Sequence, residues 1–210
     1  MRTSKLTINN NGLSLEASLA LPAVSGRYPG VVLCHPHPLY GGNMDNNIIL
    51  AVSRALASSG IAGLRFNFRG VGLSEGSFDS GLGEQDDTMS ALSFLMRHEE
   101  IDSARIGVMG YSFGGMVALE VGGRAGSVRA IAAVSPVISP GVLKNCIKPK
   151  YIICGSEDDL IPFSSIQAGA AEMAEPKKVQ VVSGADHFWW GYQDEVAEKV
   201  AGFFSDHLAV

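Results

Sequence analysis

The sequence ARIGVMGYSFGGMVALE, at residues 104–120, places Ser112 in a glycine-rich turn between an apolar run and a helix-like run. Strand, turn, serine and helix in this order form the context of a G-x-S-x-G nucleophile elbow. Gly110 and Gly114 flank the serine because a strained turn that pushes a hydroxyl forward leaves no room for neighbouring Cβ atoms. The free N–H groups at a helix start would favour negative charge near Ser112. For this motif alone, a serine that only caps a helix is the alternative.

Length and composition indicate one ordinary globular domain. The chain has 210 residues, of which 46% are hydrophobic and 18% are charged, with a net charge of −5. These values are typical of a folded globule, so we expect a single domain over residues 1–210. No apolar run approaches the ~20 residues that a bilayer crossing requires, so no membrane contact is expected. The net negative charge makes nucleic acid a poor candidate for a partner.

The N-terminus and the cysteines indicate a reducing compartment. Residues 1–6 carry charge and are followed by no apolar core of a secretory signal, so a cytoplasmic location is expected. The three cysteines are Cys34, Cys146 and Cys154, an odd count without a C-x-x-C pair. We expect all three to be reduced residues of the core.

The apolar pattern predicts an α/β fold. Alternation at residues 5–8 and 13–19 around an Asn-rich turn predicts an antiparallel hairpin. Unbroken apolar runs, typical of parallel strands buried on both faces, follow at residues 30–34, 61–66, 105–109, 128–134, 151–154 and 179–182. Helix-period stretches lie at residues 46–58, 85–98, 114–122, 164–173 and 192–208. This alternation predicts a mostly parallel sheet with helices on both faces.

Two acids fall at the expected start of one helix. Asp86 and Asp87 open the stretch at residues 85–98. Negative charge at a helix N-terminus is stabilised by the helix dipole, so a structural role is predicted for both.

A serine nucleophile needs a base and a carboxylate, and two later loops supply them. The run at residues 151–154 ends in a turn with Glu157, Asp158 and Asp159, and the run at residues 179–182 ends in a loop with His187. Both loops, like Ser112, follow the carboxyl ends of expected parallel strands, which meet at one edge of the sheet. The pattern therefore predicts that nucleophile, acid and base come together there.

An acyl-transfer site also needs N–H donors for the oxyanion. The residue after the nucleophile, Phe113, is one candidate, and the loop that follows residues 30–34 supplies the other. Pro36 and Pro38 have no N–H. The second donor is therefore His35, His37 or a residue from position 39 onward.

Two motifs carry a resemblance to a known family. Residues 35–46 read HPHPLYGGNMDN, which is similar to the H-P-H-P-x-Y-G-G-x-M-D-N motif of bacterial hydrolases of uncertain substrate. Residues 66–76 read FNFRGVGLSEG, which resembles the R-G-x-G-x-S loop of the same family. Over nearly its whole length the chain resembles a small, lidless α/β-hydrolase, broadly similar to the dienelactone hydrolase group.

The resemblance implies an α/β-hydrolase fold, with an eight-stranded, mostly parallel sheet and no cap domain. It implies Ser112 as nucleophile, Asp158 as acid, because the family's acid usually stands three residues after a glycine, here Gly155, and His187 as base. It also implies the His37 and Phe113 amides as the oxyanion hole. Dienelactone hydrolases carry a cysteine at the nucleophile position, so their substrate does not transfer to this chain.

The function expected from the sequence is hydrolysis of a small-molecule carboxylic ester or thioester through an acyl-enzyme, with no cofactor and no metal. One alternative is a non-catalytic binding protein with the same fold. Another is metal-assisted hydrolysis with His35 and His37 as ligands, although metal sites normally need three or four. Candidate pocket residues are His35, Tyr40, Tyr111 and Trp189. The uncapped site edge would suit a homodimer.

Overall fold

The computed structural model describes residues 1–209. In chain order the elements are β1 (Arg2–Asn10), β2 (Leu13–Leu21), β3 (Tyr28–Cys34), the 3₁₀ helix η1 (Pro38–Tyr40), α1 (Asn47–Ser58), β4 (Ala62–Phe66), α2 (Leu82–Arg97), β5 (Ile101–Tyr111), α3 (Phe113–Arg124), β6 (Val128–Val134), β7 (Lys150–Gly155), α4 (Phe163–Ala171), β8 (Lys177–Val182) and α5 (Gln193–Leu208).

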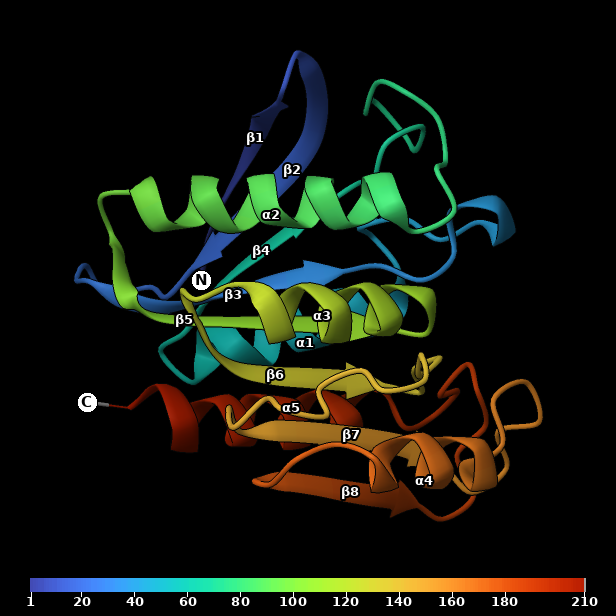
Figure 1. The fold of residues 1–210 in the computed structure, drawn as a ribbon. Coiled ribbons are helices and arrows are strands. Elements are labelled where there is room, and N and C mark those ends of the chain that lie inside the picture. The colour runs from blue at the N-terminus through green and yellow to red at the C-terminus, as the bar shows by residue number, and fades with distance from the viewer. Residues whose placement is uncertain (210) are drawn as a thin grey trace.

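One eight-stranded sheet organises the molecule, in the order β1-β2-β4-β3-β5-β6-β7-β8 (Figure 1). The β1–β2 and β2–β4 pairs are antiparallel, and every other pair is parallel. The predicted sheet and its N-terminal hairpin are therefore confirmed. Between β6 and β7, residues 135–149 form no helix or strand, so nothing is inserted there to cap the sheet edge.

Helices cover both faces of the sheet, as the alternating pattern predicted. Figure 1 shows α2, α3 and α4 on one face and α1 and α5 on the other. β3 shows why its sequence is apolar throughout: Val32 and Cys34 pack into the first helical layer, while Val31 and Leu33 pack into the second. A central strand with two covered faces has no side chain that can be polar without a buried partner.

The edge strand β8 differs from the expectation. The run at residues 179–182 was predicted to be buried on both faces, but only Val182 of β8 is buried. Lys177 and Lys178 open the strand, and β7 is its sole neighbour in the sheet. Charged side chains on an exposed edge strand oppose pairing with other chains, which explains a strand of mixed composition at this place.

The helix dipole explanation for Asp87 was wrong. Helix α2 begins at Leu82, so Asp87 lies more than a turn inside it, fully buried. Its carboxylate accepts hydrogen bonds from the Arg69 amide and guanidinium and from the Asn10 side chain. The acid of the first turn is Glu84, which accepts from the Gly81 N–H. Asp86 is exposed.

Two of the three cysteines match the expectation. All three are free, and Cys34 and Cys154 are buried in the core. Cys146 packs against the core from the segment between β6 and β7 but is only partly buried, so the prediction that it is a buried residue was wrong. Among the helices of residues 1–209, none has the length and apolar character needed to cross a membrane.

Candidate active site

Ser112 occupies a strained turn between β5 and α3. Its backbone has φ 56° and ψ −118°, a region that non-glycine residues rarely adopt. The turn is held on both sides, because the Ser112 N–H donates to the Val134 carbonyl at 2.9 Å and the Met116 N–H donates to the Ser112 carbonyl at 3.2 Å. Backbone strain of this kind persists only where the surroundings impose it, and it is concentrated at functional sites.

The glycines around Ser112 are required by close backbone contacts. A Cβ atom on Gly110 would overlap the carbonyl of Gly114, and a Cβ atom on Gly114 would overlap the carbonyls of Cys34 and His35. Glycine at both positions therefore lets the start of α3 lie against the end of β3. This contact brings the loop after Cys34 next to Ser112.

His187 and Asp158 come to Ser112 from two other strand ends. The Ser112 Oγ lies 3.1 Å from His187 Nε2, and His187 Nδ1 lies 2.8 Å from Asp158 Oδ2. Asp158 is in the loop after β7, and His187 is in the loop after β8. The three side chains thus form one hydrogen-bonded triplet at the carboxyl edge of the sheet. Glu157 and Asp159 are exposed and take no part in it.

The environment of Asp158 keeps its carboxylate ionised. Burial alone would raise its pKa, but hydrogen bonds from His187 and from the Ile161 N–H outweigh burial and hold the pKa below its ordinary value. An ionised carboxylate can only accept hydrogen bonds. His187 Nδ1 must therefore carry the proton, which leaves Nε2 free to accept from the Ser112 hydroxyl.

Two buried side chains hold the loop that contains His187 in place. The buried Tyr111 hydroxyl donates to the His187 carbonyl at 2.6 Å, and burial raises the Tyr111 pKa, so this hydroxyl remains a donor. Trp189 is also fully buried, and its indole N–H donates to Ser135 Oγ at 3.3 Å. These bonds fix the loop at His187 itself and two residues after it.

Two backbone amides beside the triplet have no acceptor. Within residues 1–209, neither the His37 N–H nor the Phe113 N–H donates a hydrogen bond. Phe113 is the first residue of α3, where N–H groups are left unsatisfied by the helix itself. The two residues touch, because the rings of His37 and Phe113 pack with centroids 4.9 Å apart.

Comparisons with known proteins give the family of the chain. Residues 11–143 match the family model of X-Pro dipeptidyl-peptidases (S15 family), and residues 85–204 match the model of PET hydrolase-like proteins. A solved α/β serine hydrolase homologue from Coxiella burnetii is 31% identical, with a TM-score of 0.88 and coverage of 96% of this chain and 97% of that one. This chain belongs to the α/β serine hydrolases.

Two further similar proteins were found. A lidless α/β serine hydrolase from Xanthomonas campestris shares the fold, with a TM-score of 0.88 at 24% identity, covering 100% of this chain and 97% of that one. An uncharacterised protein of Rickettsia prowazekii is 29% identical over 85% of this chain and 79% of its own length. The resemblance to lidless α/β-hydrolases that the motifs indicated is therefore confirmed.

A cavity of about 660 Å³ opens beside Ser112 in this hydrolase. Of the four pocket residues that the sequence predicted, Tyr40 and Tyr111 line this cavity, and residues that it did not predict also contribute. The lining residues are Pro36, His37, Tyr40, Gly41, Gly42, Asn46, Tyr111, Ser112, Phe113, Val137, Leu160, Ile161, His187 and Phe188. The missed residues Leu160, Ile161 and Phe188 stand within three residues after the acid or the base in sequence, and this proximity is the signal that could have found them.

Two predicted pocket residues do not line the cavity. Trp189 packs in the core, and the neighbouring Phe188 takes the place beside His187 instead. His35 is fully buried: its Nδ1 lies 2.7 Å from the Pro36 carbonyl, and its Nε2 accepts from the Phe68 N–H at 3.0 Å. Burial lowers its pKa to about 4. Since both ring nitrogens are engaged, His35 is not available as a metal ligand together with His37.

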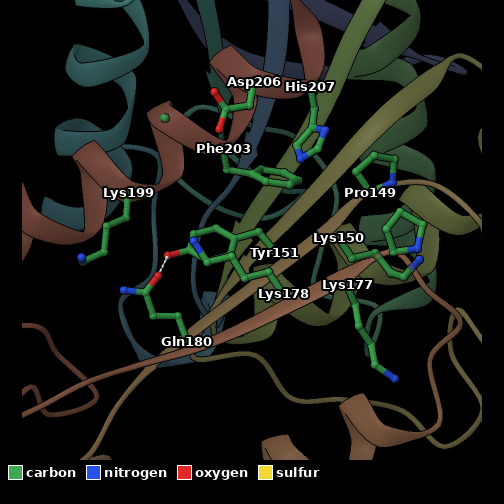
Figure 2. Close-up of a pocket in the computed structure, with 12 residues that line it drawn as sticks. Pro149, Lys150, Tyr151, Lys177, Lys178, Gln180, Lys199, Phe203, Asp206 and His207 are labelled. Carbon is green, nitrogen blue, oxygen red and sulfur yellow. Dashed lines mark hydrogen bonds between the residues drawn. The ribbon is translucent and has the colours of Figure 1, made fainter.

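A second cavity of about 460 Å³ lies at the opposite end of β7 and β8, against α5 (Figure 2). Four lysines line it, and two of them donate hydrogen bonds to backbone carbonyls. Lys150 donates to the Cys146 and Lys148 carbonyls at 2.6 and 2.7 Å, and Lys177 donates to the Met173 carbonyl at 2.7 Å. These contacts satisfy loop and helix ends, so this cavity has a structural explanation.

Proposed function

We propose that this hydrolase cleaves carboxylic esters or thioesters through an acyl-enzyme on Ser112. The observation that carries the proposal is the hydrogen-bonded triplet, in which Ser112, His187 and Asp158 meet beside an open cavity. Serine hydroxyls become nucleophiles when an oriented imidazole can take their proton. The protonation states deduced for Asp158 and His187 meet that requirement.

In the proposed reaction, Ser112 Oγ attacks the carbonyl carbon while its proton moves to His187 Nε2. Asp158 holds the Nδ1–H and stabilises the imidazolium that forms. The N–H groups of Phe113 and His37 donate to the oxyanion, which has no other partner at that point. His187 then protonates the leaving alcohol or thiol, and a water molecule, activated by His187 in turn, releases the acid and restores Ser112.

The test removes the nucleophile. Ser112→Ala should lower kcat for 4-nitrophenyl butyrate by about 10⁴-fold or more, since members of such a triplet act as a unit. It should also abolish labelling by a fluorophosphonate probe. The matched control is Ser183→Ala, which removes an exposed serine from the loop after β8. Full esterase activity in the Ser112 variant would refute the proposal.

The alternative of a non-catalytic binding protein makes a different prediction. It predicts wild-type protein that neither reacts with the fluorophosphonate nor turns over any ester in a broad panel. The strained backbone of Ser112 favours catalysis, because it costs stability without serving the fold. The His37 and Phe113 amides, which have no acceptor within residues 1–209, are consistent with a ligand-binding role. The single domain, the cytoplasmic location and the homodimer stay predictions from the sequence.

A further inference from the structure

The cavity beside Ser112 has an uncharged lining. Within residues 1–209, no aspartate, glutamate, lysine or arginine lines it. Each of four other surface cavities is lined by at least one such residue. The chain carries 16 basic and 21 acidic residues, so charge is available elsewhere on the surface and is kept out of this cavity. The composition of a lining reflects the ligand that it receives.

The one histidine in this lining outside the triplet is held neutral. Burial lowers the pKa of His37. Its Nδ1 accepts a hydrogen bond from the Leu39 N–H at 3.2 Å, which places the ring proton on Nε2. Aromatic rings surround the imidazole, with the centroids of Tyr40 and Phe78 at 4.6 and 5.0 Å. His37 therefore presents an uncharged aromatic surface to the cavity.

The mouth of the cavity is apolar and exposed. Tyr40, Val137, Leu160 and Phe188 all line it, and their exposed fractions are 86%, 47%, 63% and 52%. They come from four loops at the carboxyl edge of the sheet. Large apolar side chains gathered around a pocket and left in water mark the binding site of an apolar ligand.

We infer that the substrate is a neutral ester with apolar acyl and alcohol groups, and that a charge near the scissile bond is rejected. This inference rests on the proposed function. A carboxylate or ammonium that entered the cavity would lose its hydration and meet no counter-ion. The same reasoning disfavours a dipeptide with a free N-terminal ammonium, the group that an X-Pro dipeptidyl-peptidase has to accommodate.

A matched pair of substrates tests the inference. The 4-nitrophenyl methyl diester of glutaric acid is neutral, and mono-4-nitrophenyl glutarate differs from it by carrying a terminal carboxylate. We expect kcat/KM at pH 7.5 to be at least 100-fold higher for the neutral diester, with the Ser112→Ala rate subtracted as background. Alanyl-prolyl-4-nitroanilide should be turned over no faster than by Ser112→Ala.

A positive charge placed at the mouth should weaken this preference. Leu160→Arg retains the backbone N–H that donates to Asp158, and it should raise the ratio of kcat/KM for the anion over the diester at least tenfold. Ile147→Arg is the control, because Ile147 is 81% exposed and lies at the opposite end of the sheet. In Ile147→Arg, the ratio of kcat/KM for the anion over the diester should equal that of the wild type.

The outcomes separate the inference from the function on which it rests. Equal kcat/KM for the two glutarate esters, with activity that still depends on Ser112, would overturn the inference and leave the hydrolase proposal intact. The inference would also be overturned if the ratio of kcat/KM for the anion over the diester rose equally in Leu160→Arg and Ile147→Arg. The net charge of the protein, rather than the cavity, would then determine the preference between the two esters. Absence of any turnover that depends on Ser112 would instead overturn the proposed function.

Discussion

The two ends of the parallel strands treat their polar groups in opposite ways. At the amino ends, the ammonium groups of Lys148 and Lys150 each donate to at least two backbone carbonyls. At the carboxyl ends, within the described part of the chain, the His37 and Phe113 amides have no acceptor and Ser112 has a strained backbone. A strained residue costs about 1–3 kcal/mol. One end therefore serves stability, and the other gives up stability for groups that face a ligand.

This difference separates the expected effects of mutation. Changes at the carboxyl edge that spare packing should alter rates, and changes at the amino edge should alter the free energy of unfolding. Variants at the two ends test that division.

Asp158→Asn should have the largest effect, on rate. An amide N–H of asparagine can donate to His187 Nδ1, which would move the ring proton to Nε2 and remove the acceptor for the Ser112 hydroxyl. We expect kcat for 4-nitrophenyl butyrate to fall by about 10³- to 10⁴-fold. The urea concentration at the midpoint of unfolding should change little. Asp159→Asn, in the exposed neighbouring residue, is the control and should keep wild-type activity. Loss of activity in the control alone would move the acid to position 159.

His35 tests whether a residue that lies near the active site but has both ring nitrogens hydrogen-bonded contributes to stability. It lies near the site, yet both of its ring nitrogens are engaged and its pKa is lowered from 6.5 to about 4 by burial. Protonation of His35 is therefore disfavoured in the folded state. The contribution of neutral His35 to the free energy of unfolding is fully present above pH 6.5, and it is lost as the pH falls toward 4. Between pH 7.5 and 5 this loss is about 2 kcal/mol.

The measurement compares urea unfolding of the wild type and His35→Gln at pH 7.5 and pH 5. Glutamine retains an acceptor for the Phe68 N–H and does not titrate, so the variant should lose about 2 kcal/mol less than the wild type over this range. His207→Gln, in an exposed residue of α5, should behave like the wild type. Equal pH dependence in His35→Gln and wild type would contradict the assigned burial of the imidazole.

The sequence was sufficient where local pattern determines structure. β6 has the predicted bounds, Val128–Val134, because a strand buried between two others is apolar at its buried positions, and Arg129 is its one exposed residue. The loops with Asp158 and His187 meet Ser112 because parallel strands end at one edge, a property of topology that the alternation of strands and helices already implies.

The sequence was insufficient where tertiary contacts decide which side chain of a loop points inward. His35 and His37 stand two residues apart in one motif, and only the packing of Phe68 and Pro36 shows that the first is a buried structural residue. Phe188 and Trp189 are adjacent aromatic residues, and the backbone of Trp189, with φ 59°, turns its ring into the core. Such choices depend on residues distant in sequence, which periodicity does not contain.

Lys150→Met should have the smallest effect, on stability alone. Lys150 is 1% exposed, and its ammonium donates to two carbonyls, so its removal leaves both acceptors unpaired. Hydrogen bonds to charged groups are worth about 1.5–3 kcal/mol, and relief of the cost of burying the charge offsets part of this. A net loss of about 1–2 kcal/mol in the free energy of unfolding is expected, with kcat/KM unchanged.

The control for Lys150→Met lies in the same cavity (Figure 2). The ammonium of Lys178 lies 5.3 Å from the centroid of the Tyr151 ring and donates no hydrogen bond within residues 1–209. An exposed contact of this kind is worth about 0.5–1 kcal/mol, so Lys178→Met should cost less than Lys150→Met. If instead either variant changed kcat/KM, the amino edge would communicate with Ser112. The division between a stabilising end and a reacting end would then fail, because a residue at the amino ends of the strands would be affecting the reaction at their carboxyl ends.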